Sequence, residues 1–303
     1  MRRHVIRLLW SASLATTTVL SAQTAPSSTD IFLAPLSTRN GQMVVGTPVN
    51  VTHRVGYDNQ PSFSRDGRLL FFTSVRADSQ ADIYRYDIST RTIARVTDTR
   101  ESEYSATVFG DGTRFSVIRV EADSTQRLWS FRLDGSDPQL VLERVKPVGY
   151  HAWVDDNTLA LFVLGSPSTL QLVDTRSGRT EEVARNIGRS LTTLPGGNAF
   201  SYVQHMADSS WTLIAVDVRP PPPTGRWTAR PLVRMPVGSD YVAWLDHGVA
   251  LAGQGSRLLR WSTRSPGAWT PVADLTRAGV QRISRLAISP DRRWIAFVAE
   301  PAS

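Results

Sequence analysis

The histidines and the paired acidic residues are the side chains of this sequence that could carry acid–base or metal chemistry. Imidazole and carboxylate groups are the usual general acids, general bases and zinc ligands of proteins. The acidic pair, Asp155 and Asp156, falls within a turn pattern that recurs along the chain, and that pattern accounts for it. The five histidines never fall at the short spacings that bring metal ligands together on one element. They are His4, His53, His151, His205 and His247.

A hydrolase-type serine nucleophile is not indicated either. Such an enzyme would show Gly-x-Ser-x-Gly on a turn between a strand and a helix. The nearest segments, "GSPS" from Gly165 and "GQGS" from Gly253, have neither that form nor a helix after them. The chain has no cysteine, so it has no thiol nucleophile and no disulfide framework. We therefore predict no metal, no cofactor and no enzymatic activity, except for chemistry built from dispersed residues.

A repeated phrase indicates the elements that must position any site. "NQPSFSRDGRLLFFTS" (59–74) and "SATVFGDGTRFSVIRV" (105–120) share one apolar pattern around an Asp-Gly pair. Asp, Asn and Gly tolerate the backbone conformations of tight hairpin turns. Similar pairs recur at intervals of 40 to 51 residues along the chain, and the last of them is a poor turn by its chemistry. The six pairs are Asp66-Gly67, Asp111-Gly112, Asp156-Asn157, Gly196-Gly197, His247-Gly248 and Asp291-Arg292.

Apolar, β-branched and aromatic residues on both sides of each turn predict six β-hairpins, which start near residues 61, 106, 151, 191, 242 and 286. A third and a fourth strand follow every hairpin except the last. "DIFLAPL" (30–36) is similar to the third strand "DIYRYDI" (82–88), and "PVNVT" (48–52) is similar to the fourth strand "ARVT". Each hairpin with its third and fourth strands would form one four-stranded sheet, a blade, and residues 30–52 would complete the sixth of these. The sequence predicts an all-β protein, a six-bladed β-propeller of four-stranded blades whose last blade is closed by N-terminal and C-terminal strands.

The first and last hairpins carry a resemblance to a known family. "QPSFSRDGRLLFFTS" and "LAISPDRRWIAFVA" (286–299) resemble the Ser-Pro-Asp-Gly, WD40-like repeat of TolB-like β-propellers. These propellers occur in the periplasmic TolB protein and in prolyl-oligopeptidase-type peptidases. The resemblance covers nearly all of the chain after its leader, weakly in the middle blades. The resemblance implies the fold and not the function. We expect neither the additional domain of TolB nor the hydrolase domain of the peptidases, because the propeller would use nearly all residues after the leader.

The N-terminal residues predict export. Three arginines precede an uncharged, mainly apolar stretch (8–20), which is typical of a signal peptide at 1–22 and too short for a stable membrane span. Residues 23–303 would then form a single propeller domain in the periplasm or outside the cell, with no membrane span after cleavage. Without the three arginines of the signal peptide the formal net charge falls from +7 to +4, and such a mildly basic chain gives no reason to expect a nucleic-acid partner. We expect a monomer.

The innermost strands of a propeller line its central channel, so the residues at the start of each first strand should surround one mouth. Tyrosine and arginine are frequent in this ring, and both are common binding anchors. They could instead form only the polar rim of a water-filled channel. The ligand-binding residues predicted at the channel mouth are Asn59, Gln60, Tyr104, Tyr150, His151, Arg189, Asp240, Tyr241 and Arg285.

Two classes of function remain for this ring. The first, which the resemblance to TolB implies, is a scaffold module that binds a protein or peptide of the bacterial cell envelope. The second is an enzyme, a hydrolase or lyase acting on sugars or peptides, built from dispersed channel residues such as His151, Asp240 and Arg285. A hydrogen bond from His151 to an acid or a tyrosine inside the channel would favour the enzyme.

Overall fold

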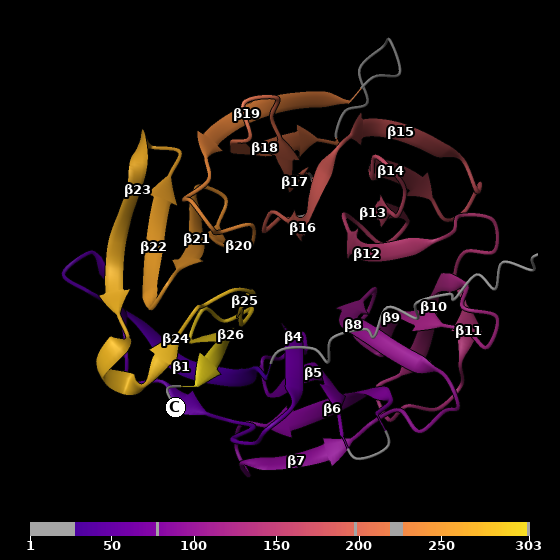
Figure 1. The fold of residues 1–303 in the computed structure, drawn as a ribbon, viewed down its shortest axis with the longest axis horizontal. Helices are drawn as coiled ribbons and strands as arrows, with labels where there is room; N and C mark the ends of the chain where they lie inside the picture. Colours follow the sequence, from indigo (N-terminus) through magenta and orange to yellow (C-terminus); the bar gives the residue numbers. More distant parts are fainter. Residues whose placement is uncertain (1–27, 77–78, 197–198, 219–226, 302–303) are drawn as a thin grey trace, which may run out of the picture.

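The computed structural model describes residues 28–76, 79–196, 199–218 and 227–301, which form six antiparallel sheets arranged in a ring (Figure 1). The predicted signal peptide, residues 1–22, lies outside the described residues. One short 3-10 turn, η1 (Thr276–Ala278), is the only helical element in these ranges. Within them, no helix is long and apolar enough to cross a membrane. The predicted six-bladed, all-β propeller is confirmed.

Each of the first three blades contains four strands in sequence order from the channel outward. Blade 1 consists of β4 (Tyr57–Phe63), β5 (Leu69–Val75), β6 (Ala81–Asp87) and β7 (Thr92–Arg95). Blade 2 consists of β8 (Ser102–Phe109), β9 (Arg114–Val120), β10 (Gln126–Arg132) and β11 (Gln139–Leu140). Blade 3 consists of β12 (Val148–Trp153), β13 (Thr158–Val163), β14 (Thr169–Asp174) and β15 (Thr180–Arg185).

Blades 4 and 5 repeat this order, and blade 6 combines segments from both ends of the described chain. Blade 4 consists of β16 (Ile187–Thr193), β17 (Ala199–His205), β18 (Trp211–Asp217) and β19 (Thr228–Arg234). Blade 5 consists of β20 (Val242–Asp246), β21 (Val249–Gln254), β22 (Arg257–Ser262) and β23 (Ser265–Asp274). Blade 6 consists of β25 (Leu286–Ile288), β26 (Trp294–Pro301), β1 (Asp30–Arg39), β2 (Gln42–Val45), β3 (Val49–Asn50) and the short β24 (Val280–Gln281).

The pairing of β1 with β26 closes the ring, from Asp30 opposite Ala299 to Pro35 opposite Trp294. The fourth strand of this blade is divided, because β3 pairs with the first half of β1 and β2 with the second half. The predicted similarity between residues 30–52 and the outer strands of blade 1 extends to a matching hydrogen bond. Ile31 N donates to Thr52 Oγ1, just as Ile83 N donates to Thr97 Oγ1 in blade 1.

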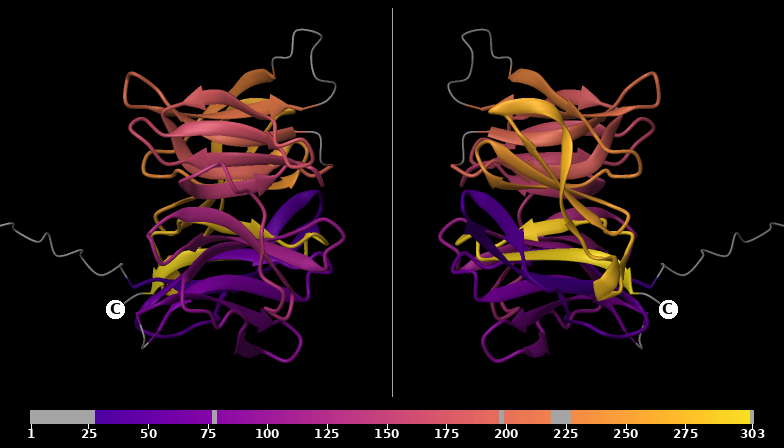
Figure 2. Two further views of the ribbon diagram at one scale, coloured as in Figure 1. Left: turned by 90° about the vertical axis from the view of Figure 1, so that its right-hand side faces the viewer. Right: turned by 90° about the vertical axis from the view of Figure 1, so that its left-hand side faces the viewer.

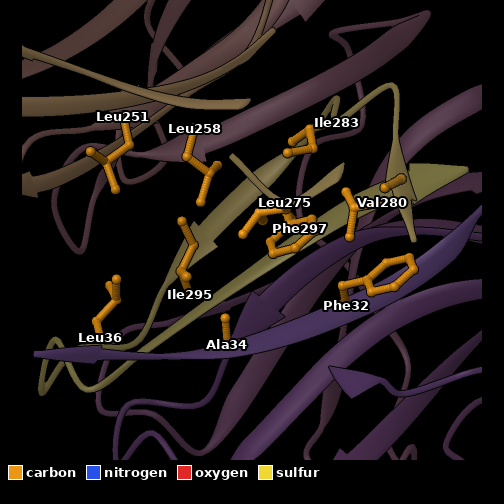
Figure 3. Packing of buried hydrophobic residues seen from close by; sticks show 11 residues of the cluster. Phe32, Ala34, Leu36, Leu251, Leu258, Leu275, Val280, Ile283, Ile295 and Phe297 are labelled. Atoms are coloured by element: carbon orange, nitrogen blue, oxygen red, sulfur yellow. The ribbon is translucent and has the colours of Figure 1, made fainter. Parts of the chain in front are cut away.

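The hydrophobic core of the described residues is divided into six clusters, one between each pair of neighbouring blades. Figure 3 shows the cluster between blades 5 and 6, where Leu251 and Leu258 face Phe32, Ile295 and Phe297. The Phe32 and Phe297 rings stack with their centroids 5.6 Å apart. Each blade therefore buries its faces only against its neighbours, which explains why the sequence repeats as whole blades.

The Ser-x-Asp turns of blades 1 and 6 fold alike. Asp66 Oδ1 accepts hydrogen bonds from Ser64 Oγ and Arg68 N, and Asp291 accepts the same pair from Ser289 and Arg293. Gly67 holds a φ of 70° in the first turn, and Arg292 takes 59° at the corresponding place in the other. The turn that looked poor by its chemistry therefore forms, with an arginine in the left-handed region. Viewed from the side, the connecting loops project from both faces of the ring (Figure 2).

Candidate functional site

The first strands β4, β8, β12, β16, β20 and β25 face the centre of the ring (Figure 1). Several of them are interrupted by β-bulges near the channel mouth. The register shifts between Asn59 and Ser62 in β4 and between Tyr104 and Thr107 in β8. Gln60 and Ser105, inside these two bulges, both have a φ of 59°. Such bulges change the direction of side chains without ending the sheet, so they decide which residues reach the channel.

A cavity of about 140 Å³, here called the tyrosine chamber, lies in the channel. Its wall combines residues from all six first strands or the residues just before them. Six of the predicted site residues line it, and the structure thus brings together side chains that are far apart in the sequence. They are Gln60, Tyr150, His151, Arg189, Tyr241 and Arg285.

Arg285 is the central polar group of the tyrosine chamber. Its Nη2 donates a hydrogen bond of 3.0 Å to Tyr150 Oη. Its guanidinium carbon lies 4.1 Å from the centre of the Tyr241 ring and 4.8 Å from that of Tyr150. Among the described residues it forms no ion pair with a carboxylate. This half-buried cation is therefore held by aromatic rings and one phenol.

Burial keeps the hydroxyl groups of Tyr57, Tyr104 and Tyr241 protonated over the physiological range. Burial raises the pKa of Tyr57 to about 12, although the nearby Arg285 opposes the shift. Burial also raises the pKa values of Tyr104 and Tyr241 above the ordinary value. Tyr57, at the start of β4, was missed by the sequence analysis. All of these hydroxyl groups can donate hydrogen bonds.

The remaining predicted residues lie around the chamber rather than in its wall. Asn59 is buried, and its Oδ1 accepts a hydrogen bond of 2.9 Å from Gln60 N. Tyr104 packs against the cluster between blades 2 and 3. Burial raises the pKa of Asp240, and the nearby Arg285 and Arg189 oppose that shift. Asp240 thus lies in the electrostatic field of the two arginines, without an ion pair to Arg285.

Gln60 has a structural role that the sequence did not indicate. Its Oε1 accepts hydrogen bonds of 2.8 Å from Thr73 Oγ1 in its own blade and from Ser105 N in blade 2. The side chain therefore joins two bulged strands across a blade boundary. Its carbonyl oxygen is already occupied, which leaves the amide nitrogen for a ligand.

His151 contacts a serine and not an acid or a tyrosine. Its Nε2 lies 2.7 Å from Ser116 Oγ, which also accepts a hydrogen bond of 2.9 Å from Trp153 Nε1. Burial lowers the pKa of His151 to about 3, so the imidazole is neutral. Its Nδ1 is buried and has no partner among the described residues. Ser116 is fully buried and does not line either cavity, so it lacks the access that a nucleophile requires, even though His151 lines the tyrosine chamber.

A second, larger cavity of about 890 Å³ adjoins the first at the end where the hairpin turns lie, and we call it the turn chamber. Phe109 and Trp153 form a flat shelf in its wall, with ring centroids 4.2 Å apart and an interplanar angle of 6°. Arg65 and Asp156 are exposed in turns that line it. Phe109 belongs to blade 2 and Trp153 to blade 3, so the sequence of either repeat alone does not indicate the shelf.

The described residues contain no group of three or more His, Cys, Asp or Glu side chains placed to hold a metal ion. The two members of the acidic pair have different roles: Asp155 forms hydrogen bonds within the turn, whereas Asp156 is exposed. Asp155 Oδ1 accepts bonds from Asn157 N and Thr158 N within the turn, as expected for the hairpin pattern. The polar groups available to a ligand are therefore chiefly guanidinium and phenol groups.

Comparisons with known proteins agree on the fold. No protein-family model matches the sequence. A TolB-type protein from Agrobacterium tumefaciens has a TM-score of 0.69 at 14% identity, with 92% of this chain and 100% of that chain covered. TolB from Acinetobacter baumannii has a TM-score of 0.58 at 12% identity, covering 89% of this chain and 64% of that one, less than two thirds of its length. A gluconolactonase from Xanthomonas campestris has a TM-score of 0.62 at 10% identity, covering 92% and 99%.

These similarities show that the chain has the fold of a TolB-like propeller, as its repeats predicted. The same architecture also occurs in an enzyme. A propeller of this type can therefore host either class of function, and the residues of the channel must decide between them.

Proposed function

We propose that this protein is an exported module of the cell envelope that binds a protein or peptide at the tyrosine chamber. The observation that carries the proposal is the combination of this chamber with exposed apolar residues on the same face. Val55 and Val237 are 90% and 88% exposed, in the loops that lead into β4 and β20. Leu164 and Met206 are exposed after β13 and β17, which end on that face. Aromatic and arginine side chains gathered in one pocket are typical anchors of protein-binding surfaces.

The fold similarity to TolB proteins supports a place in the periplasm or outside the cell, and the sequence of residues 1–22 supports export. The contacts of His151 support a function without catalysis. In the described residues it is a neutral, buried group bonded to a serine, rather than a base held by an acid.

The proposal is tested by a pull-down from an extract of the cell envelope. The bait is the full chain beside a triple variant, Arg189→Ala, Tyr241→Ala and Arg285→Ala, with folding checked by circular dichroism. A matched control, Arg65→Ala with Asp156→Ala, alters exposed residues of the turn chamber on the opposite face. We expect the parent and the control to capture the same partner and the triple variant to lose it. Capture by all three proteins would place the binding surface elsewhere, and capture by none would contradict the proposal.

The second candidate is an enzyme that acts on a sugar derivative. The observation that favours it is the turn chamber, whose aromatic shelf and exposed Asp156 resemble the lining of many carbohydrate sites. The fold similarity to a gluconolactonase agrees with this candidate. Hydrolysis of gluconolactone can be followed with a pH indicator, with Asp156→Asn and Trp153→Leu as variants. A rate equal to that of the uncatalysed reaction would argue against it.

A further inference from the structure

Arg285 carries a positive charge that no described carboxylate pairs with. Its guanidinium has five N–H donors. One hydrogen bond from it is formed, between Nη2 and Tyr150 Oη. Buried or half-buried charges in proteins are usually paired, because an unpaired charge loses its hydration without compensation. In the described part of the chain the other donors of Arg285 have no protein partner, and they remain available to a ligand that enters the chamber.

The surroundings of Arg285 add to the positive field of the tyrosine chamber. Arg189, an exposed residue, lines the same cavity. Asp240 lies near both arginines, but it forms no ion pair with Arg285, and a single carboxylate cannot balance two guanidinium groups. The chamber keeps a net positive charge and a set of phenolic donors around an empty volume of about 140 Å³.

The two aromatic contacts fix how Arg285 presents its donors. The Tyr241 ring lies under the guanidinium at 4.1 Å, and the Tyr150 ring lies at 4.8 Å from it. The Tyr241 ring covers the guanidinium carbon from one side, whereas the N–H bonds point outward from the edges of the planar group, where Nη2 already contacts Tyr150 Oη. A planar carboxylate can accept two parallel hydrogen bonds from such an edge.

We propose that the tyrosine chamber is a carboxylate-binding site in which Arg285 is the anchor. This inference rests on the proposed function and deepens it: the segment that binds at the channel mouth presents a carboxylate to Arg285. A carboxylate fits the small chamber and the planar guanidinium edge. In a protein or peptide segment it comes from an acidic side chain or from a free C-terminus, and a sugar acid is the alternative source that the test separates from these.

The test uses small carboxylates with the full chain, by isothermal titration calorimetry at low salt. Glutarate is the probe and glutaramide its neutral counterpart. We expect glutarate to bind and glutaramide not to bind. We expect Arg285→Ala to weaken binding about tenfold or more, because a hydrogen bond to a charged group contributes this much. Arg285→Lys should bind with intermediate affinity, since it keeps the charge without the planar edge.

Two further variants guard against a loss of structure. Tyr150→Phe removes the hydroxyl that holds Arg285 and keeps the ring, so it should weaken binding severalfold while the protein stays folded. Arg65→Ala removes an exposed arginine of the turn chamber and should leave the affinity unchanged. Equal affinity of the parent and Arg285→Ala, or no binding of glutarate, would overturn the inference. Tighter binding of inorganic phosphate than of glutarate would overturn it too.

Three further probes assign the source of the carboxylate. They are a tripeptide with an internal glutamate and blocked ends, a tripeptide with a free C-terminus, and glucuronate. Whichever binds most tightly through Arg285 identifies the source. The outcomes also separate this inference from the proposed function. A partner lost in the triple variant, with no glutarate binding, overturns the carboxylate site alone, whereas glutarate binding without any captured partner overturns the proposed function alone.

Discussion

The guanidinium carbon of Arg285 lies 4.1 Å from the centre of the Tyr241 ring, so that a cation before β25 stacks on an aromatic ring before β20. The contact joins blades 5 and 6 at the channel wall. It therefore couples the geometry of the chamber to the packing of blade 5 against blade 6, the blade whose strands close the ring.

This stacking predicts a measurable coupling between the two residues. In a double-mutant cycle of Arg285→Ala and Tyr241→Leu, we expect a coupling of about 0.5–2 kcal/mol in the free energy of unfolding, as for a partly desolvated cation–π pair. Urea unfolding of the four proteins measures it. The control cycle pairs Tyr241→Leu with Arg65→Ala on the opposite face and should be additive within about 0.5 kcal/mol. Additivity in the first cycle would show that the stacking contributes nothing.

The buried His151 predicts a loss of stability in mild acid. Burial lowers its pKa from 6.5 to about 3. Between these values the unfolded chain binds a proton that the folded protein does not, so the free energy of unfolding falls by up to about 1.4 kcal/mol per pH unit as the pH drops. Urea unfolding from pH 7 to pH 4.5 should show a steeper decline for the parent than for His151→Leu. Parallel profiles would mean that His151 accepts a proton in the folded state.

The left-handed arginine of the last turn predicts a stabilising substitution. Arg292 has a φ of 59° where blade 1 has Gly67, and its side chain is exposed. Arg292→Gly should raise the free energy of unfolding by roughly 0.5–1 kcal/mol, because glycine adopts this conformation without the steric cost that other residues have. Gly67→Ala is the reverse control and should destabilise. Thermal unfolding of both variants would decide the point, and a lower midpoint for Arg292→Gly would contradict the prediction.

Replacing Thr52, the threonine that follows β3 in blade 6, should lower the stability of the protein. Thr52 Oγ1 accepts a hydrogen bond from Ile31 N and donates one to Asp30 Oδ1. Thr52→Val should lower the free energy of unfolding by about 1–3 kcal/mol, because it leaves the Ile31 amide without its partner and removes one of the hydrogen bonds that Asp30 accepts. Thr97→Val in blade 1 should have a similar effect. Thr90→Val, at an exposed turn, should change it by less than about 0.5 kcal/mol. An effect confined to Thr97 would show that the terminal strands are held by their ladder alone.

The closure of the ring could be predicted from the sequence because it depends on local chemistry that repeats. An Asp-Ile pair begins the third strand and a threonine ends the fourth, both in blade 1 and in the N-terminal segment. The same hydrogen bond follows from the same residues, as Ile83 with Thr97 and Ile31 with Thr52 show. The divided fourth strand was not predicted, because β2 follows a tight turn at Asn40 and Gly41 that has no equivalent in the other blades.

The candidate site could be predicted only in part. Positions along each first strand were counted back from its hairpin turn, which assumes the same number of residues between turn and channel mouth in every blade. Bulges add residues between the turn and the mouth, and they differ among the blades. The register shifts between Ile187 and Leu191 in β16, over a longer stretch than in β4. Counting back from the turn thus found Arg285 and Tyr241 but passed over Tyr57. Contacts between blades, such as Ser116 with His151, depend on the packing of two separate repeats and leave no pattern in the sequence.

The antiparallel pairing of β1 with β26 has a mechanical consequence. Asp30 and Ala299 lie opposite each other at one end of the pair, so a force applied to the two chain ends would act at that end. The hydrogen bonds between these strands would then break one after another, as a zip opens, instead of resisting together in shear. Blade 6 is therefore the point at which the ring should yield first under tension, while the other five blades stay intact.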